Sequence, residues 1–511
     1  MTKTTHNEQF SSRWGLILAS LGMAIGAGNL WRFPRIAGQY GGTFLILWTL
    51  FLFVWSIPIL MTEFSIGKRF KKGVIASFAG AVGKNFTWMG VFIALCTLGI
   101  TFYYSVVTAW GMRYLGMSLS FLFSQESLGS ELAQNPSYLK SFWEQISNGN
   151  ILTLVLHALA VGIGILVLFR GIQKGLEQVN KFLIPSLFIL MLVVAAVALN
   201  TENGVKGLYY MFSVDMSLFR DPQVWIEALS QSAWSTGAGW GLMLTISSYS
   251  RDKEDVTMNI FISGVGNNVA SMVAGIAILP SVFAVAGNEQ EAISFLQSGN
   301  QALTFTVIPQ LYTKIAGGNI LSVVFFLAFT LAAFSSLLTM LELFIRLVTD
   351  MGLTRKSATV VTGVACLIFG FPSAWSLDFF SNQDWVWGIG LIVSGLFIIF
   401  VAFKNDIFTY KERFIDKDSD FKVPNVYYIF TLVLNIPLGA LLIWWWMSRG
   451  YSESPWFTED GTWNMMDVYS NATIITQWGL VLLLGIILNG WLYKYLMGNG
   501  KPKGTAVLQN D

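Results

Sequence analysis

The sequence GMAIGAG at residues 22–28 interrupts an apolar segment of membrane-spanning length near its middle. The sequence STGAGWG at residues 235–241 interrupts a second such segment. In hydrocarbon every backbone N–H and C=O group needs a hydrogen-bond partner, so unwound backbone at membrane depth persists only where protein buries it or it lines a polar cavity. Two such breaks in corresponding helices mark the central binding site of a transport protein. They therefore predict a pathway for a solute.

The composition predicts an all-α integral membrane protein. Of the 511 residues, 54% are hydrophobic, 15% are aromatic and only 12% are charged. A search for apolar stretches of about 20 residues finds about twelve candidate spans. They begin near Arg13, Gly42, Asn85, Ile151, Gly175, Val224, Val256, Ile320, Ala358, Asp384, Tyr427 and Thr473.

The positions of lysine and arginine predict the orientation, because short cytoplasmic loops carry an excess of both. The basic clusters all follow even-numbered spans, at residues 68–72, 170–181, 251–253, 355–356 and 404–422. The longest loop on the opposite side has Lys140 as its sole basic residue. We therefore expect a multi-pass protein of the plasma membrane, the inner membrane in a bacterium, with both termini in the cytoplasm.

The two breaks also predict the domain organisation. They lie in the first and sixth spans, so five spans separate them and the halves are expected to be inverted repeats. The expected architecture is a 5+5 inverted repeat with discontinuous helices 1 and 6, plus helices 11 and 12. A single transporter domain at 13–496 would contain the first repeat (13–200), the second repeat (222–404) and the last two helices (425–496), between cytoplasmic segments at 1–12 and 497–511.

Several other classes of function find no support in the sequence. The formal net charge of +2 is too small to indicate nucleic-acid binding. There is no zinc motif and no catalytic Cys–His set, and the chain has only two histidines, so an enzyme is not expected. Cys96 and Cys366 fall within spans, where free cysteine is a small apolar packing residue. A receptor or channel that does not transport remains an open alternative, and the oligomeric state is unknown.

Helix ends at the breaks provide ion-binding groups. The N-terminus of a half-helix exposes N–H groups and a positive dipole that suit a carboxylate, and freed carbonyls suit a cation. Uncharged oxygens close to the breaks are candidate ligands for a hard cation such as sodium. They belong to Asn29, Ser235, Asn267, Ser335 and Ser336. A single serine in a span more often bonds its own helix or a neighbour, so the adjacent Ser335 and Ser336 are the stronger signal.

Ionisable side chains within spans cost at least ~2.5 kcal/mol each at the bilayer centre, so they are expected to face the interior of the bundle. Glu63, Glu342 and Arg32 are such residues. Arg32 lies just beyond the first break, and Asp384 begins the tenth predicted span at a similar height. These two are expected to form an outer gate pair.

Residues 13–34, RWGLILASLGMAIGAGNLWRFP, closely resemble the first span of the neurotransmitter:sodium symporters. The resemblance covers nearly the whole chain. It continues through Tyr40-Gly41-Gly42, Tyr103-Tyr104, Gln231, the break in the sixth span, Asn267, Ser335-Ser336 and Asp384. It implies a sodium-coupled secondary active symporter that imports a small amino acid by alternating access.

The resemblance implies two sodium sites and one substrate site. The first sodium site would use the Ala24 carbonyl, Asn29, Ser235 and Asn267, together with the substrate carboxylate. The second would use the carbonyls of Gly22, Ile25 and Ala332 and the hydroxyls of Ser335 and Ser336. The implied substrate-binding residues are Met23, Ala24, Ala27, Gly28, Ile100, Tyr104, Trp234, Ser235, Gly237, Trp240, Ser336 and Met340.

Three residues bear on the class of substrate. Gly26 stands where monoamine transporters of the family carry an aspartate, which favours an amino acid or a related zwitterion. Trp234 and Trp240 reduce the space for a side chain and favour a small substrate. The same aromatic faces suit a methylated ammonium group through cation–π attraction, so a betaine-like osmolyte is the alternative substrate.

The resemblance leaves two further questions open. Ser271 replaces the glutamate of chloride-independent bacterial relatives, so a chloride ion could be held by Gln231, Ser235, Asn267 and Ser271, with Trp48 in place of the usual tyrosine. At the inner gate, Asp350 matches the acid of the family, but the usual arginine position falls on Asn7. Phe10 replaces a usual tryptophan. The candidates to compensate for the missing arginine are Lys3, His6 and Arg13.

Overall fold

A computed structural model describes residues 8–449 and 451–498, which contain helices, loops and one isolated β-bridge between Phe457 and Trp463. Ten helices in this part of the chain are long and apolar enough to cross a membrane. They are Ala27–Phe70, Lys84–Phe123, Ile151–Leu168, Ile172–Leu199, Val256–Phe283, Gly318–Asp350, Arg355–Trp375, Leu377–Lys404, Asn425–Ser448 and Asn471–Met497. The all-α fold class is therefore confirmed.

The first and sixth predicted spans do not appear as separate helices among these ten, because each is broken. The first consists of α1 (Arg13–Ala24) and the start of α2 (Ala27–Phe51). The sixth consists of α11 (Pro222–Thr236) and α12 (Leu242–Ser248). The glycines at residues 22–28 and 235–241 therefore interrupt helices where the sequence predicted.

Gly41 separates the second half of the first span from the second span. Its φ of +56° and ψ of −144° interrupt the helical geometry within α2. A Cβ there would lie 2.9 Å from the carbonyl oxygen of Ser213, so glycine fits both the backbone conformation and the space. The second span then continues through a π-helical turn at Leu52–Ser56 into α3 (Ile57–Phe70).

Most other spans begin within a few residues of their predicted positions. They are α5 (Thr87–Phe123), α8 (Ile151–Leu168), α9 (Gln178–Leu199), α13 (Val256–Phe283), α17 (Gly318–Asp350), α18 (Arg355–Trp375), α21 (Asn425–Ser448) and α22 (Asn471–Met497). The exception is α19 (Leu377–Lys404). The tenth span was placed wrongly, because α19 starts at Leu377 and not near Asp384. The Ser376 hydroxyl caps α19 by accepting a hydrogen bond from the Phe379 amide at 3.3 Å, which places Asp384 inside the helix.

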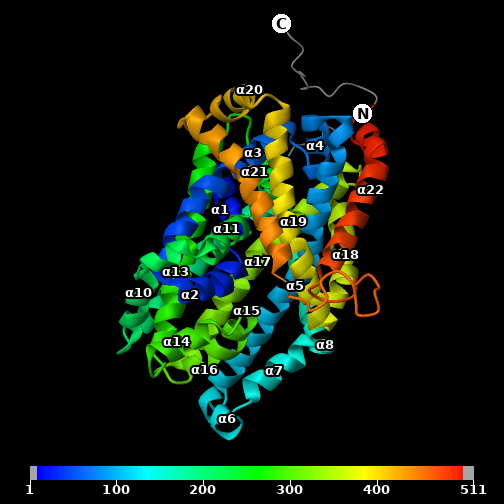
Figure 1. The fold of residues 1–511 in the computed structure, drawn as a ribbon. Coiled ribbons are helices and arrows are strands. Elements are labelled where there is room, and N and C mark those ends of the chain that lie inside the picture. Colours follow the sequence, from blue (N-terminus) through cyan, green and yellow to red (C-terminus); the bar gives the residue numbers. More distant parts are fainter. Residues whose placement is uncertain (1–7, 450, 499–511) are drawn as a thin grey trace.

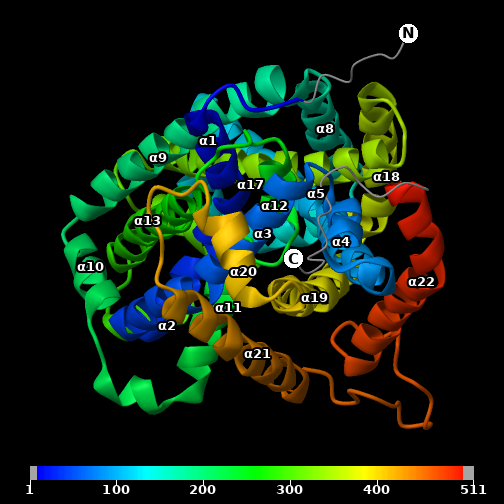
Figure 2. The ribbon, with the colours of Figure 1, turned by 90° about the horizontal axis from the view of Figure 1, so that it is seen from above.

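The broken helices lie in the interior of the bundle. Seen along its axis, α1, α12, α3 and α17 lie near the middle, whereas α21 and α22 lie at the periphery (Figure 2). One end of the bundle carries α4 (Val74–Val82) and α20 (Ile407–Lys411) (Figure 1). Short helices cover the other end, namely α6 (Leu128–Gln134), α7 (Tyr138–Ser147), α14 (Glu289–Leu296) and α16 (Ile308–Tyr312).

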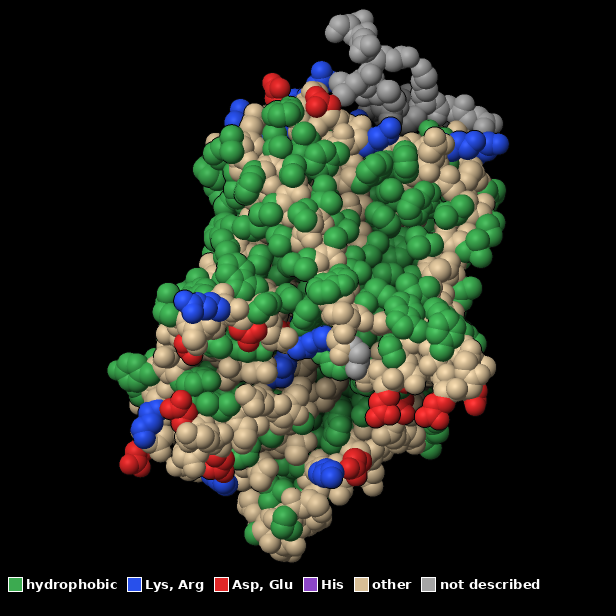
Figure 3. Space-filling model, viewed as in Figure 1, with side chains coloured by type: hydrophobic (Ala, Val, Ile, Leu, Met, Phe, Trp, Pro, Cys, Tyr) green, Lys and Arg blue, Asp and Glu red, His purple; other side chains and the backbone are tan. Residues whose placement is uncertain are grey.

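Charged side chains flank a broad hydrophobic band on the surface (Figure 3). Lysine and arginine line the end of the bundle that carries α4 and α20, which we call the basic end. Both ends of the described chain lie there, because the Phe10 amide donates to the Tyr249 carbonyl at 3.0 Å and Lys72 Nζ donates to the Leu496 carbonyl at 3.2 Å. That the basic end faces the cytoplasm remains a prediction.

Candidate functional site

The first break frees backbone groups on both of its sides. α1 ends at Ala24, Ile25 and Gly26 are extended, and α2 begins at Ala27. The last carbonyls of α1 and the first N–H groups of α2 therefore have no partner within a helix. Asn29 provides a partner for one of the backbone groups at the break, because its Oδ1 accepts a hydrogen bond from the Gly26 amide at 2.9 Å.

The second break depends on three glycines with left-handed backbone conformations. Gly237, Gly239 and Gly241 have φ values of +70°, +92° and +74°. Glu63 of α3 holds this segment by accepting hydrogen bonds from the amides of Gly239 at 3.0 Å and Leu244 at 3.3 Å. Glu63 is fully buried, which confirms that it faces the interior of the bundle. Its carboxylate replaces helical partners that the unwound segment lacks.

A cavity of about 70 Å³ lies between the two breaks. Its lining contains nine of the twelve predicted substrate residues, namely Met23, Ala24, Gly28, Tyr104, Trp234, Gly237, Trp240, Ser336 and Met340. Ala27, Ile100 and Ser235 were also predicted but do not line it. Six residues outside the predicted set do so, namely Gly26, Asn29, Trp31, Tyr103, Leu242 and Asp384.

The walls of this cavity combine free backbone groups with aromatic rings. The Tyr104 hydroxyl accepts a hydrogen bond from the Ala27 amide at 3.0 Å, so a tyrosine hydroxyl adjoins the N-terminus of α2. Trp234 and Trp240 meet nearly at right angles, with ring centroids 5.2 Å apart and an interplanar angle of 87°. The cavity therefore offers groups that suit a carboxylate beside a narrow aromatic corner.

Gly26 leaves no room for a side chain, and we expect its replacement to impair binding. A Cβ there would lie 2.7 Å from both Ser336 Oγ and Tyr104 Oη. Gly26→Ala should displace these hydroxyls at a cost of about 1–3 kcal/mol and weaken binding of the amino acid that the resemblance implies roughly 5- to 150-fold. Equilibrium binding of labelled amino acids would measure the loss. Gly162→Ala on α8 is the control, because its Cβ would meet nothing within 4 Å; equal binding by both variants would contradict the prediction.

The residues predicted for the first sodium site lie together. Asn29 Nδ2 donates to Asn267 Oδ1 at 2.9 Å, and Asn267 Nδ2 donates to Ser235 Oγ at 3.1 Å. The Asn267 amide also faces the carbonyl oxygens of Ala24 at 3.2 Å and Ser235 at 3.0 Å. When Asn267 Oδ1 points towards these two carbonyl oxygens, three oxygen acceptors converge, which is the arrangement that a cation requires. When the amide is rotated by 180°, Asn267 Nδ2 takes the place of Oδ1 and donates hydrogen bonds to both carbonyls.

The residues predicted for the second sodium site are also adjacent. Ser335 Oγ donates to the Ala332 carbonyl at 2.9 Å and the Ile25 carbonyl at 3.1 Å. Ser336 Oγ donates to the Gly22 carbonyl at 3.2 Å. The hydroxyls of α17 therefore meet the carbonyls that α1 leaves free where it ends. That these five oxygens bind one sodium ion remains a prediction.

The predicted chloride residues are buried beside the first sodium set. Ser271 is fully buried, and its Oγ accepts a hydrogen bond from Asn29 Nδ2 at 2.7 Å. Gln231 is buried, and its Oε1 has no hydrogen-bond partner among the described residues. Trp48 Nε1 likewise has no partner within the described part of the chain.

Arg32 and Asp384 line one cavity of about 270 Å³ next to the first one, on the side away from the basic end. Arg32 donates to Ser230 Oγ at 2.7 Å and pairs with Glu227 at 3.6 Å. Asp384 accepts a hydrogen bond from the Tyr103 hydroxyl at 2.8 Å. In this conformation each residue has another partner, so their mutual gate contact stays a prediction. Glu227 had no distinguishing pattern in the sequence.

Asp350 at the basic end pairs with Arg346 at 3.5 Å and accepts a hydrogen bond from the Gly73 amide at 2.6 Å. The predicted substitutes for the missing arginine do not contact it within the described residues. Arg13 pairs instead with Glu254 at 2.9 Å, and Lys3, His6 and Asn7 lie outside the described part of the chain.

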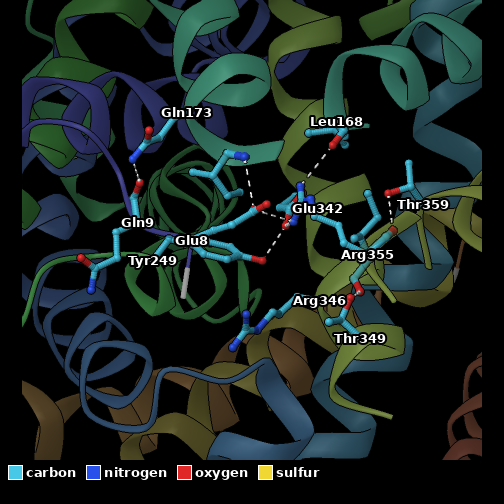
Figure 4. Close-up of polar contacts among 12 residues, drawn as sticks. Glu8, Gln9, Leu168, Gln173, Tyr249, Glu342, Arg346, Thr349, Arg355 and Thr359 are labelled. Atoms are coloured by element: carbon cyan, nitrogen blue, oxygen red, sulfur yellow. Dashed lines mark hydrogen bonds and ion pairs between the residues drawn. The ribbon is translucent and has the colours of Figure 1, made fainter. Parts of the chain in front are cut away.

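A different set of charges connects the N-terminal segment to the bundle (Figure 4). Arg355 pairs with Glu342 at 2.7 Å and with Glu8 at 3.2 Å. The fully buried Glu342 also accepts a hydrogen bond from the Tyr249 hydroxyl at 2.6 Å. Gln173 Nε2 donates to the Gln9 carbonyl at 2.7 Å. Sequence reasoning assigned Arg355 only to the basic loops and did not find this contact.

The sequence profile of the Sodium:neurotransmitter symporter family matches residues 7–150 and 138–403. The chain belongs to this family. The sodium-dependent transporter MJ1319 of Methanocaldococcus jannaschii is 30% identical over 354 residues, which cover 69% of this chain and 72% of the relative. The sodium-dependent transporter YhdH of Bacillus subtilis is 27% identical over 385 residues, which cover 73% of this chain and 80% of the relative.

The fold is similar to a solved structure, that of MhsT in complex with L-phenylalanine. The TM-score is 0.72 at 28% identity, over 86% of this chain and 99% of MhsT. The symporter is therefore a multi-pass membrane protein with the fold of MhsT. Family membership confirms that it is a sodium-dependent secondary transporter and not an enzyme.

Proposed function

We propose that this transporter imports a small amino acid together with sodium by alternating access. The cavity between the two breaks carries the proposal. It places the N-terminus of α2 and the hydroxyls of Tyr104 and Ser336 next to two groups of oxygens suited to sodium. MhsT was solved with an amino acid, which supports the same class of substrate here.

The size of the cavity supports a small substrate. A volume of about 70 Å³ accommodates only a few water-sized groups. Trp234 and Trp240 form its walls, so glycine and alanine fit this conformation better than phenylalanine. In the proposed cycle, Arg32 and Asp384 close the outer side after binding. A membrane potential that is negative inside drives sodium inward with ~2.3 kcal/mol per charge per 100 mV.

A betaine-like osmolyte is the second candidate substrate. The perpendicular rings of Trp234 and Trp240, 5.2 Å apart, resemble two faces of an aromatic cage, and Tyr104 lines the same cavity. Such cages bind quaternary ammonium groups through cation–π attraction.

Binding to the purified transporter tests these proposals. Labelled glycine, alanine, phenylalanine and glycine betaine would be compared in sodium and in potassium. We expect sodium-dependent binding of glycine or alanine. Binding of betaine in preference to both would favour the osmolyte, and binding indifferent to sodium would overturn the proposal. Accumulation above equilibrium in proteoliposomes with a sodium gradient would exclude a receptor or a channel.

Replacement of chloride by gluconate tests the proposed chloride site. Ser271 provides no negative charge beside the first sodium set, which favours a bound chloride. The names of MJ1319 and YhdH mention sodium alone, which favours independence from chloride. A loss of sodium-dependent binding in gluconate would support Gln231, Ser235, Asn267 and Ser271 as the chloride ligands. Unchanged binding would remove that assignment and leave the sodium sites intact.

A further inference from the structure

Asn180 of α9 is a buried amide without hydrogen bonds. Its side chain is fully buried, and neither Oδ1 nor Nδ2 has a hydrogen-bond partner among the described residues. Leaving a buried polar group unpaired costs about 1–3 kcal/mol. Leucine has the same branched shape and would avoid this cost. A polar side chain that lowers stability at such a position calls for a functional explanation.

The position of Asn180 relates it to the second sodium set. A Cβ on Gly22 would lie 2.8 Å from Asn180 Oδ1 and 3.1 Å from Nδ2, so the amide fits against the bare backbone of this glycine. The Gly22 carbonyl is one of the five oxygens of that set and accepts a hydrogen bond from Ser336. The amide of Asn180 therefore lies against Gly22, a residue of the set, on the side of α1 that faces α9.

Asn180 also lies between this set and the basic end. Glu177 precedes it by one turn on the same face of the helix. Glu177 contacts Gly15, which lies nearer than Gly22 to the start of α1. Its carboxylate accepts hydrogen bonds from the Ser11 amide at 2.8 Å and from Lys181 Nζ at 2.8 Å. The contacts of Asn180 with Gly22 and of Glu177 with Gly15 thus follow one another along α1 towards its start, which lies at the basic end.

We propose that Asn180 is a transient sodium ligand, whose Oδ1 coordinates the ion as it leaves the second sodium site towards the basic end. Hard cations take oxygen ligands, and a conducting path requires intermediate sites that bind weakly enough to release the ion. A neutral amide with no other partner meets both conditions. The inference rests on the proposed function, because it requires the second sodium site.

Two variants of Asn180 separate coordination from packing. Asn180→Leu keeps the number and branching of the non-hydrogen atoms and removes the oxygen, and Asn180→Asp keeps an oxygen. Asn435→Leu on α21 is the matched control, because Asn435 is also fully buried, its Oδ1 has no partner in the described part of the chain, and its Nδ2 makes only one long bond of 3.4 Å. Two quantities would be measured: stabilisation against heat by sodium, and sodium-driven uptake of labelled glycine, alanine and phenylalanine into proteoliposomes.

In Asn180→Leu, we expect the sodium concentration for half-maximal stabilisation to stay within about threefold of the wild-type value. Its maximal uptake rate should fall about tenfold or more. Asn180→Asp should retain uptake within about threefold, and Asn435→Leu should transport like the wild type. Uptake by Asn180→Leu at the wild-type rate would overturn this inference but not the proposed function. An equal loss of uptake in Asn180→Leu and Asn180→Asp would do the same. A wild type that sodium does not stabilise would overturn the proposed function and this inference with it. If Asn180→Leu does not fold, Asn180→Ala provides the same comparison.

Discussion

Asn29→Ala is expected to abolish sodium-dependent substrate binding. Asn29 has three partners around the first break, because its Oδ1 accepts from the Gly26 amide and its Nδ2 donates to Asn267 and Ser271 of α13. Each group left unpaired costs about 1–3 kcal/mol, and a proposed sodium ligand is lost as well. We expect the affinity for sodium, measured by heat stabilisation in sodium and in potassium, to fall more than about a hundredfold.

Two further variants test whether this loss is specific. Ser271→Ala removes one of the three partners and should cost about tenfold or less in sodium affinity. Asn435→Ala removes a buried asparagine remote from the site and should leave sodium binding unchanged. If Asn29→Ala binds sodium as Asn435→Ala does, the first sodium site has been assigned to the wrong residues.

The sequence predicted most of the fold because its signals are local. Glycine clusters within apolar segments identify the broken helices, and hydropathy identifies the remaining spans. The start of α19 was missed because Ser381, Asn382 and Gln383 resemble a loop in composition. The capped helix nevertheless continues through them, and the side chains of Asn382 and Gln383 bond each other and α22. One such bond joins Gln477 Nε2 to Asn382 Oδ1 at 2.8 Å.

The site was predictable where its residues belong to a recognisable pattern. The breaks, Asn267 and the pair Ser335–Ser336 all meet in the structure. The charge partners were not predictable, because each pairing joins elements far apart in the sequence. Glu227 next to Arg32 and Glu8 next to Arg355 depend on how the helices pack. The unpaired amide of Asn180 likewise becomes visible only once its neighbours are known.

Arg355→Ala is expected to open the basic end of the transporter. Arg355 is the cationic partner of Glu342, which is fully buried, and also pairs with Glu8 of the N-terminal segment. Removing one partner of a buried ion pair costs about 3–5 kcal/mol, because the remaining charge stays buried. We expect opening of the basic end to admit water to Glu342 and relieve this cost, so Arg355→Ala should shift the equilibrium towards the open conformation by about a hundredfold or more.

Labelling of an introduced cysteine measures this opening. Ser20 of α1 is fully buried, so Ser20→Cys should react with a thiol reagent only when α1 moves, and the native Cys96 and Cys366 are buried as well. Labelling in the Arg355→Ala background should be about a hundredfold faster.

The control and the compensating variant show whether the uncompensated charge is the cause. Arg13→Ala at the same end is the control, because it removes a half-exposed arginine from Glu254 while Asn259 Nδ2 still donates to that carboxylate at 3.0 Å, so labelling should change much less. Glu342→Leu combined with Arg355→Ala removes both charges and should restore slow labelling, since replacing a whole buried pair by apolar groups is often neutral.

Fast labelling in this double variant would mean that Arg355 closes the basic end through its contact with Glu8. Unchanged labelling in Arg355→Ala alone would mean that the N-terminal segment is held by its other contacts, such as that of Ser11 with Glu177.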